Sequence, residues 1–226
     1  MKLCLVTDRR RLGSAVGARP EDYIDALRGQ VSAAAAAGVD YIQVREPDLE
    51  ARQLADLVRC LLKAVAGTPA KLLVNDRLDV ALATEASGVQ LKEQGIHPEA
   101  VRRIAPPGFL IGCSVHSPAY AAARRGADFL IAGTVLPTAS KHAPDYLNED
   151  GLRRVVDAAA GQPVLGIGGL DIPSIPLLAN SGASGMAAVG AFIPEQGESA
   201  GERLSEFVQK RVTDLRFALD RATRRP

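Results

Sequence analysis

A run of hydroxyl and ammonium groups follows an apolar segment in the second half of the chain. The apolar residues 129–132 lead into Gly133, and Thr138, Ser140 and Lys141 then appear within four positions. Two short hydroxyl groups beside a positive charge could hold the oxygens of a phosphate or diphosphate group. A solvated loop is the alternative interpretation of the same residues.

A second phosphate signal is the glycine-rich run GIGG at 166–169, which also follows an apolar segment. A glycine-rich turn between a strand and a helix exposes backbone N–H groups that can bind a phosphate. We expect Gly168 and Gly169 to present such groups, together with Gly190 at the end of the next apolar segment. A tight turn without a ligand is the alternative.

Charged side chains follow two further apolar segments. The guanidinium of Arg45 matches the oxygens of a phosphate or carboxylate, although it could instead pair with Glu46 or a neighbouring carboxylate. Asp76 could hold Mg²⁺, which prefers one or two carboxylates together with substrate phosphates, or it could cap the helix that follows. These residue types together predict a site for an anionic, phosphorylated ligand.

These side chains need a scaffold that brings the ends of several strands together. Eight short aliphatic segments alternate with helical patterns, at residues 3–7, 41–45, 71–75, 88–91, 110–115, 129–135, 164–168 and 185–189. Each segment is apolar throughout, which is typical of a parallel sheet covered by helices. The pattern predicts one (β/α)₈ TIM barrel as a single domain over residues 1–226, with an open doubly wound sheet as the alternative. In such a barrel the carboxyl ends of the strands form one rim, where the polar residues would meet.

Composition narrows the class of protein. Lys and Arg number 27 against 26 Asp and Glu, so the chain lacks the basic excess of a nucleic-acid-binding protein. No stretch reaches the ~18 apolar residues that span a membrane. Three scattered cysteines fit a reducing compartment rather than a disulfide framework, and Cys113 is expected in the core. We therefore expect a cytoplasmic protein that binds phosphorylated small molecules; its assembly is left open, a homodimer being one alternative.

The order of these motifs resembles the thiamine phosphate synthase/TenI family. The resemblance extends over essentially the whole chain, through Thr7-Asp8-Arg9, Gln43-Val44-Arg45-Glu46, Asn75-Asp76-Arg77, Ser114-Val115-His116-Ser117, the segment from Gly133 to Lys141, and Gly166-Ile167-Gly168-Gly169. It implies a TIM barrel and an enzyme that joins 4-amino-5-hydroxymethyl-2-methylpyrimidine diphosphate to 4-methyl-5-(2-phosphoethyl)thiazole, giving thiamine phosphate and diphosphate. In the family mechanism diphosphate leaves first, and the thiazole nitrogen captures the pyrimidine cation.

The resemblance also implies roles for individual residues. Asp76 looks like a ligand of the cofactor Mg²⁺, and Gly168 looks like part of the thiazole phosphate site. Catalytic roles are expected for Arg45, Ser114 and Lys141. The residues that look like diphosphate and pyrimidine ligands are Gln43, Arg45, Asn75, Ser114, Thr138, Ser140 and Lys141.

Some positions depart from the family pattern. Pro47 stands where the family usually has a lysine, and Gly95 stands where it usually has a second metal-binding aspartate, with Glu93 as the nearest substitute. The related TenI proteins are thiazole tautomerases, whose catalytic histidine corresponds to Thr134. The alternatives to a synthase are therefore a TenI-like tautomerase, and a non-catalytic barrel that binds thiamine precursors or regulates a partner.

Overall fold

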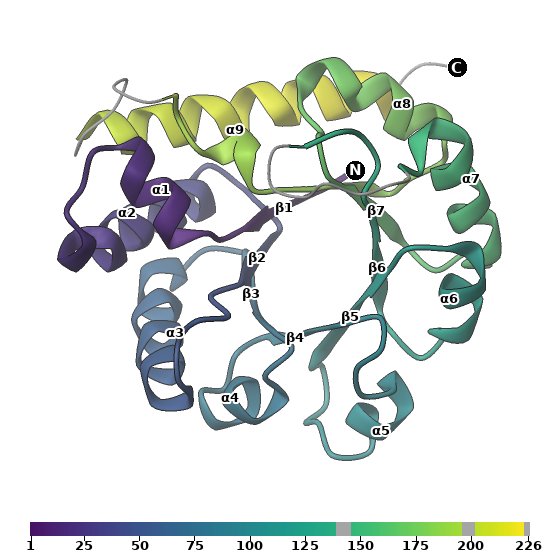
Figure 1. Cartoon of the computed structure of the whole chain (residues 1–226), viewed down its shortest axis with the longest axis horizontal. Coiled ribbons are helices and arrows are strands. Elements are labelled where there is room, and N and C mark those ends of the chain that lie inside the picture. Colours follow the sequence, from purple (N-terminus) through teal and green to yellow (C-terminus); the bar gives the residue numbers. More distant parts are fainter. Residues whose placement is uncertain (139–145, 196–201, 224–226) are drawn as a thin grey trace.

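The computed structural model describes residues 1–138, 146–195 and 202–223, and its strands form a closed parallel barrel (Figure 1). Neighbours in the barrel follow chain order, and the last strand pairs in parallel with the first. This closure confirms the predicted TIM barrel and excludes the open sheet. The strands are β1 (Lys2–Val6), β2 (Tyr41–Val44), β3 (Lys71–Asn75), β4 (Gly88–Leu91), β5 (Leu110–Val115), β6 (Phe129–Gly133), β7 (Val164–Ile167) and β8 (Gly185–Ala188).

Helices surround the barrel on its outside (Figure 1). The described α-helices are α1 (Arg9–Ala15), α2 (Tyr23–Ala36), α3 (Ala51–Val65), α4 (Leu78–Ala83), α5 (Pro98–Arg102), α6 (Pro118–Ala123), α7 (Asn148–Ala158), α8 (Ile175–Asn180) and α9 (Glu202–Thr223). Short 3₁₀ turns are η1 (Pro20–Asp22), η2 (Ile172–Ser174) and η3 (Gly190–Phe192).

Local sequence explains where several helices begin. The Asp8 carboxylate accepts a hydrogen bond from the backbone N–H of Arg11 and so starts α1. Glu50 and Gln53 form a reciprocal capping box at the start of α3. Pro118 occupies the first turn of α6, where its missing N–H leaves no bond unmade.

The predicted strands are all present, but several end one or two residues earlier than expected. The segment expected at 129–135, for example, ends at Gly133. The residues just beyond the strands begin the loops of the rim, although the N–H groups of Thr7 and Val135 still donate to carbonyl oxygens of neighbouring strands. Apolar character alone does not mark this point, because Thr134 and Val135 are themselves buried.

Strand residues pack into two separate apolar groups because successive side chains point to opposite faces. One group lies between the strands and the helices and includes most of the core. The other fills the barrel interior, with Cys4, Val6, Leu73, Phe129, Ile131, Leu165 and Ala187. Burial on both faces explains why the strands are apolar throughout.

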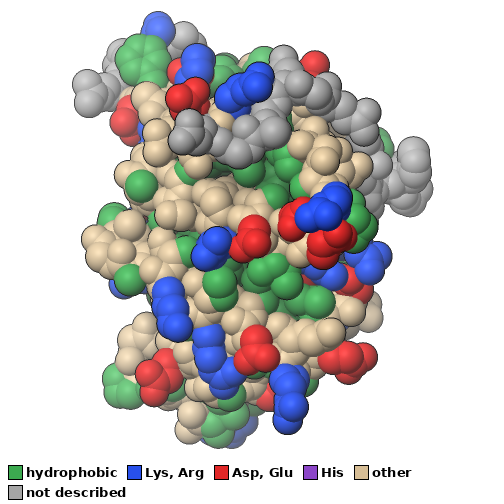
Figure 2. Space-filling view, turned by 90° about the vertical axis from the view of Figure 1, so that its left-hand side faces the viewer, with side chains coloured by type: hydrophobic (Ala, Val, Ile, Leu, Met, Phe, Trp, Pro, Cys, Tyr) green, Lys and Arg blue, Asp and Glu red, His purple; other side chains and the backbone are tan. Residues whose placement is uncertain are grey.

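The outer surface carries charges of both signs. On the face shown in Figure 2, positive and negative side chains lie next to one another, in agreement with the balanced charge of the sequence. Among the helices of the described ranges, none combines the length and apolar character needed to cross a membrane.

We expect only one of the three cysteines to react in the native protein. Cys4 and Cys113 are fully buried, and burial raises the pKa of each thiol to about 12. Cys60 is half-buried on α3. Because the thiolate is the reactive form, titration with a disulfide reagent should modify Cys60 in the folded protein and all three residues after unfolding. Rapid native modification of Cys113 would contradict this placement.

Candidate active site

A cavity of about 750 Å³ opens at the carboxyl ends of the strands. The polar residues at its wall come from segments far apart in the chain, because a closed barrel brings all strand ends to one rim. The predicted site residues that line it are Gln43, Arg45, Asn75, Ser114, Thr138, Gly168, Gly169 and Gly190.

Three further predicted residues have different outcomes. Asp76 follows β3 at the cavity rim and forms an ion pair with Lys92, which lines the cavity. Ser140 and Lys141 lie outside the described residues. Their assignment to a diphosphate site therefore stays a prediction from the sequence.

The inner wall of the cavity carries two side-chain amides in direct contact. Gln43 Nε2 donates a 2.8 Å hydrogen bond to Asn75 Oδ1, between neighbouring strands β2 and β3. This bond fixes both planar groups. It leaves the carbonyl oxygen of Gln43 as an acceptor and the NH₂ group of Asn75 as a donor for a ligand.

Ser114 is also fixed by an amide. Gln90 Nε2 donates to Ser114 Oγ at 3.2 Å, and the Gln90 side chain is almost fully buried inside the barrel. Gln90 Oε1 has no hydrogen-bond partner among the described residues. The barrel interior therefore changes from apolar to polar toward its carboxyl end.

Arg45 is exposed at the cavity, and its guanidinium forms no ion pair with a described residue. Its backbone N–H donates to Thr7 Oγ1 at 2.9 Å. The Glu46 carboxylate is buried and accepts hydrogen bonds from Thr7 Oγ1 at 2.7 Å and Arg9 Nη1 at 2.8 Å. The alternative that Arg45 pairs with Glu46 is therefore wrong, because these adjacent side chains have different surroundings.

The residues after β1 hold the rim together. Arg9 contacts Glu46 and also donates to both carboxylate oxygens of Asp48, at 2.7 and 2.6 Å. These bonds from Arg9 lower the pKa of Asp48 to about 2. Thr7 and Arg9 thus link the loops after β1 and β2 and fix the backbone of Arg45.

Arg11 is a cavity residue that the sequence patterns did not identify. It lies in the first turn of α1, lines the cavity, and forms no ion pair with a described residue. Its Nη2 atom would lie 3.7 Å from a Cβ atom placed on Gly190. The Asp8 cap could have indicated a helix here, but only the barrel places this helix beside β8.

The glycines after β7 are required by the backbone. Gly168 has φ +101° and Gly169 has φ +65°, conformations that other residues rarely adopt. A Cβ atom on Gly168 would also lie 2.4 Å from Thr134 Cγ2. The Gly168, Gly169 and Gly190 N–H groups donate no backbone hydrogen bond within the described ranges, so they remain open to an anion.

The residues around Asp76 do not fit a preformed Mg²⁺ site. Its Oδ2 atom lies 2.5 Å from Lys92 Nζ, so an ammonium already neutralises the carboxylate. Glu93 Oε1 instead accepts a 2.6 Å hydrogen bond from the backbone of His116. The described residues contain no group of three or more acidic, His or Cys side chains suited to a metal. Asp76 does not cap α4 either, since the N-cap residue is Arg77.

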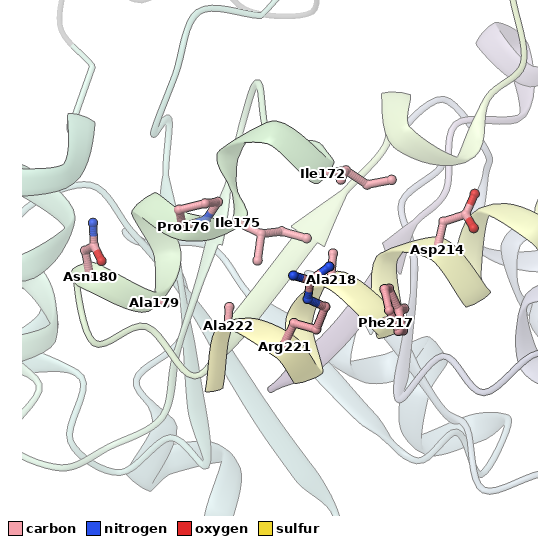
Figure 3. Close-up of a pocket in the computed structure, with 10 residues that line it drawn as sticks. All are labelled: Ile172, Ile175, Pro176, Ala179, Asn180, Asp214, Phe217, Ala218, Arg221 and Ala222. Carbon is pink, nitrogen blue, oxygen red and sulfur yellow. The ribbon is translucent and has the colours of Figure 1, made fainter. Parts of the chain in front are cut away.

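A second hollow, of about 620 Å³, lies on the outside of the barrel between α8 and α9 (Figure 3). Ile172, Ile175 and Pro176 face Phe217 and Ala218 across it. Its wall is largely apolar, and it lies outside the ring of strand ends. We therefore assign the candidate active site to the cavity at the barrel mouth.

Comparison with known proteins identifies the family. Residues 14–192 match the family model described as thiamine monophosphate synthase. The chain belongs to the thiamine phosphate synthase/TenI family. It is 32% identical to a thiamine-phosphate synthase of Pyrococcus abyssi, with 95% of this chain and 96% of that protein covered. It is 37% identical to a putative thiamine-phosphate synthase of Geobacter sulfurreducens, covering 85% and 87%.

A solved structure of the thiamine phosphate synthase/TenI family has the same architecture. Thiamine phosphate pyrophosphorylase from Pyrococcus furiosus is 30% identical and superposes with a TM-score of 0.75, covering 98% of this chain and 96% of that one. A 3-hexulose-6-phosphate synthase at 17% identity and a TM-score of 0.64 shares the fold alone. Two departures from the family pattern, Pro47 and Thr134, line the cavity.

Proposed function

We propose that the protein is a thiamine phosphate synthase. It joins the pyrimidinylmethyl group of 4-amino-5-hydroxymethyl-2-methylpyrimidine diphosphate to the nitrogen of 4-methyl-5-(2-phosphoethyl)thiazole. The observation that supports this proposal is one cavity with two separate regions suited to anions around an amide-lined wall. Arg45 lies on the β2 side, and Gly168, Gly190 and Arg11 lie around β7 and β8. Two phosphorylated substrates can therefore meet in this cavity.

The paired amides suit the pyrimidine. An aminopyrimidine has an NH₂ donor beside ring nitrogen acceptors. Gln43 offers an acceptor and Asn75 offers donors, and their mutual hydrogen bond holds both groups in one orientation. Ser114, fixed by Gln90, adds a hydroxyl at the same wall. These contacts support binding of the pyrimidine ring at the inner wall.

Charge on the leaving group directs the chemistry. The C–O bond between the pyrimidinylmethyl carbon and the diphosphate breaks, and its electron pair goes to the diphosphate. The thiazole nitrogen then donates its lone pair to the carbon, forming the C–N bond. Arg45 can stabilise the negative charge that develops on the diphosphate, and Thr138 lines the same cavity. Lys141 is predicted from the sequence to add a further positive charge.

The other two functions are less well supported. The family's tautomerase histidine corresponds to Thr134, whose hydroxyl is a poor acid or base near neutral pH. A tautomerase also has no diphosphate to bind, so it would not use Arg45. A non-catalytic barrel would retain the binding residues, and only a turnover measurement separates it from a synthase.

The direct test is incubation of the protein with both substrates and Mg²⁺, following diphosphate release and thiamine phosphate formation together. A synthase forms the two products in equal amounts, and omission of either substrate abolishes both. Binding of both substrates in calorimetry without turnover would instead identify a non-catalytic barrel. Turnover of the thiazole tautomer alone would identify a tautomerase.

Gly190 gives a test of the thiazole phosphate site that leaves the fold intact. A Cβ atom there meets only Arg11 Nη2, at 3.7 Å, whereas one on Gly168 collides with Thr134. We expect Gly190→Val to weaken binding of thiazole phosphate by about tenfold or more, since loss of a hydrogen bond to a charged group has this magnitude. Calorimetry measures the affinity.

Gly168→Val serves as the comparison. The strained backbone at φ +101° predicts that this variant loses thermal stability as well as phosphate binding. Gly190→Val should melt near the wild-type temperature. Unchanged thiazole phosphate affinity in a folded Gly190→Val variant would show that the anion binds elsewhere.

A further inference from the structure

An ion pair joins the loops after β3 and β4 at the rim of the cavity. Lys92 Nζ lies 2.5 Å from Asp76 Oδ2, and Lys92 also lines the cavity. The Lys92 side chain is 66% exposed and that of Asp76 is 30% exposed. Exposed pairs of this kind contribute little to stability. A small rearrangement of this ion pair therefore costs little, and the Lys92 ammonium can contact a ligand in the cavity while it stays beside Asp76.

Gly95 leaves Asp76 without a second carboxylate. The backbone N–H of Gly95 donates to the carbonyl oxygen of Lys92 at 3.0 Å, which closes a tight turn. A Cβ atom on Gly95 would lie 3.5 Å from Asp76 Oδ1. A carboxylate at this position would thus face Asp76 and could share a divalent cation with it. In this chain the positive charge that lies beside the Asp76 carboxylate is the Lys92 ammonium.

The loop that carries Lys92 is fixed from behind. The nearly buried Arg124 donates hydrogen bonds to the carbonyl oxygens of Glu93 and Ile96. The Glu93 carboxylate accepts from the backbone N–H of His116 at 2.6 Å, and so it does not turn toward Asp76. These contacts give the Lys92 backbone a defined position at the rim.

We propose that Lys92 replaces a protein-bound divalent cation at Asp76, and that its ammonium binds the diphosphate of the pyrimidine substrate directly. A lysine ammonium is a compact charge with three N–H donors, so it can keep its contact with Asp76 and donate to a diphosphate oxygen as well. The inference rests on the proposed function for the identity of the substrate. Its two consequences are diphosphate binding without a divalent cation, and weak divalent binding by the free protein.

The first test measures the affinity for inorganic diphosphate by calorimetry, with a chelator present. Lys92→Ala should weaken binding by about 10- to 100-fold, the usual effect of losing a hydrogen bond between charged groups. Lys92→Arg should keep part of the affinity. The matched control is Lys71→Ala, which removes the same charge at the opposite end of β3 and should bind like wild type. Equal affinities for wild type and Lys92→Ala would overturn the proposal.

The second test measures Mn²⁺ binding by electron paramagnetic resonance, without substrate. Wild type should bind weakly, and the double variant Lys92→Ala/Gly95→Asp should bind at least about tenfold more tightly, since two carboxylates then face each other. Wild-type Mn²⁺ affinity equal to that of the double variant would also overturn the proposal.

The outcomes separate this inference from the proposed function. If Lys92→Ala loses diphosphate binding while wild type forms no thiamine phosphate, the inference holds and the proposed function fails. If wild type forms thiamine phosphate while Lys92→Ala binds diphosphate normally, the proposed function holds and the inference fails.

Discussion

Replacement of Arg45 by alanine is expected to lower kcat for thiamine phosphate formation by about 10²–10³, or roughly 2.7–4 kcal/mol, the usual effect of removing a group aimed at developing charge. The Arg45 guanidinium faces the cavity without an ion-pair partner among the described residues, so its charge is available to the leaving diphosphate. The effect should appear mainly in kcat, because the negative charge on the bridging oxygen grows as the C–O bond breaks.

Two variants make this measurement specific. Arg45→Lys should recover only part of the rate, since an ammonium does not reproduce the planar fork of a guanidinium. Arg103→Ala removes the same charge from an exposed position after α5 and should leave kcat unchanged. The KM for thiazole phosphate should stay near wild type in Arg45→Ala. Full activity of that variant would remove Arg45 from the catalytic site.

Replacement of Glu46 by alanine is expected to cause the largest loss of stability, about 3–5 kcal/mol, because the Thr7 hydroxyl and the backbone N–H of Arg9 lose their buried acceptor and the Arg9 guanidinium keeps only Asp48. The carboxylate is only 4% exposed and accepts hydrogen bonds from Thr7 and Arg9. At about 2–4 °C per kcal/mol for a chain of this size, Tm should fall by roughly 6–20 °C.

Thermal melts of two further variants provide the controls. Glu46→Gln keeps the shape and some of the hydrogen bonds, and so it should lose less stability than Glu46→Ala. Asp79→Ala breaks the exposed Arg77–Asp79 ion pair, whose loss should change stability by at most about 1 kcal/mol. If the Glu46→Ala variant had the same Tm as the Asp79→Ala variant, the hydrogen bonds of Glu46 with Thr7 and Arg9 would not stabilise the rim.

Glu46 also connects stability to function. Thr7 Oγ1 donates to Glu46 and accepts from the backbone N–H of Arg45. Loss of Glu46 should therefore loosen the loop that carries Arg45 and lower activity even at temperatures where the variant is folded. Comparison of kcat below the transition with the melting curve separates the two effects.

The sequence by itself determined the architecture of this protein. Eight apolar strands alternating with amphipathic helices have few ways to bury both faces of a parallel sheet, and a barrel also removes exposed strand edges. It also predicted which strand ends line the cavity at the barrel mouth. Gln43, Asn75, Ser114 and the glycines after β7 follow directly from their positions at those ends, and the structure places them around one cavity.

The tertiary structure decided which neighbouring polar residues face the cavity and which support it. Arg45 and Glu46 are adjacent in the chain, yet Arg45 is exposed at the cavity and Glu46 is buried against Arg9. This distinction depends on the fold of the neighbouring loop.

The tertiary structure also brings together residues that are distant in the chain. Arg11 reaches Gly190 only because barrel closure brings α1 beside β8. Lys92 meets Asp76 for the same kind of reason, since β3 and β4 pair in parallel. Such pairings depend on register and loop geometry between distant segments, which local residue patterns do not specify.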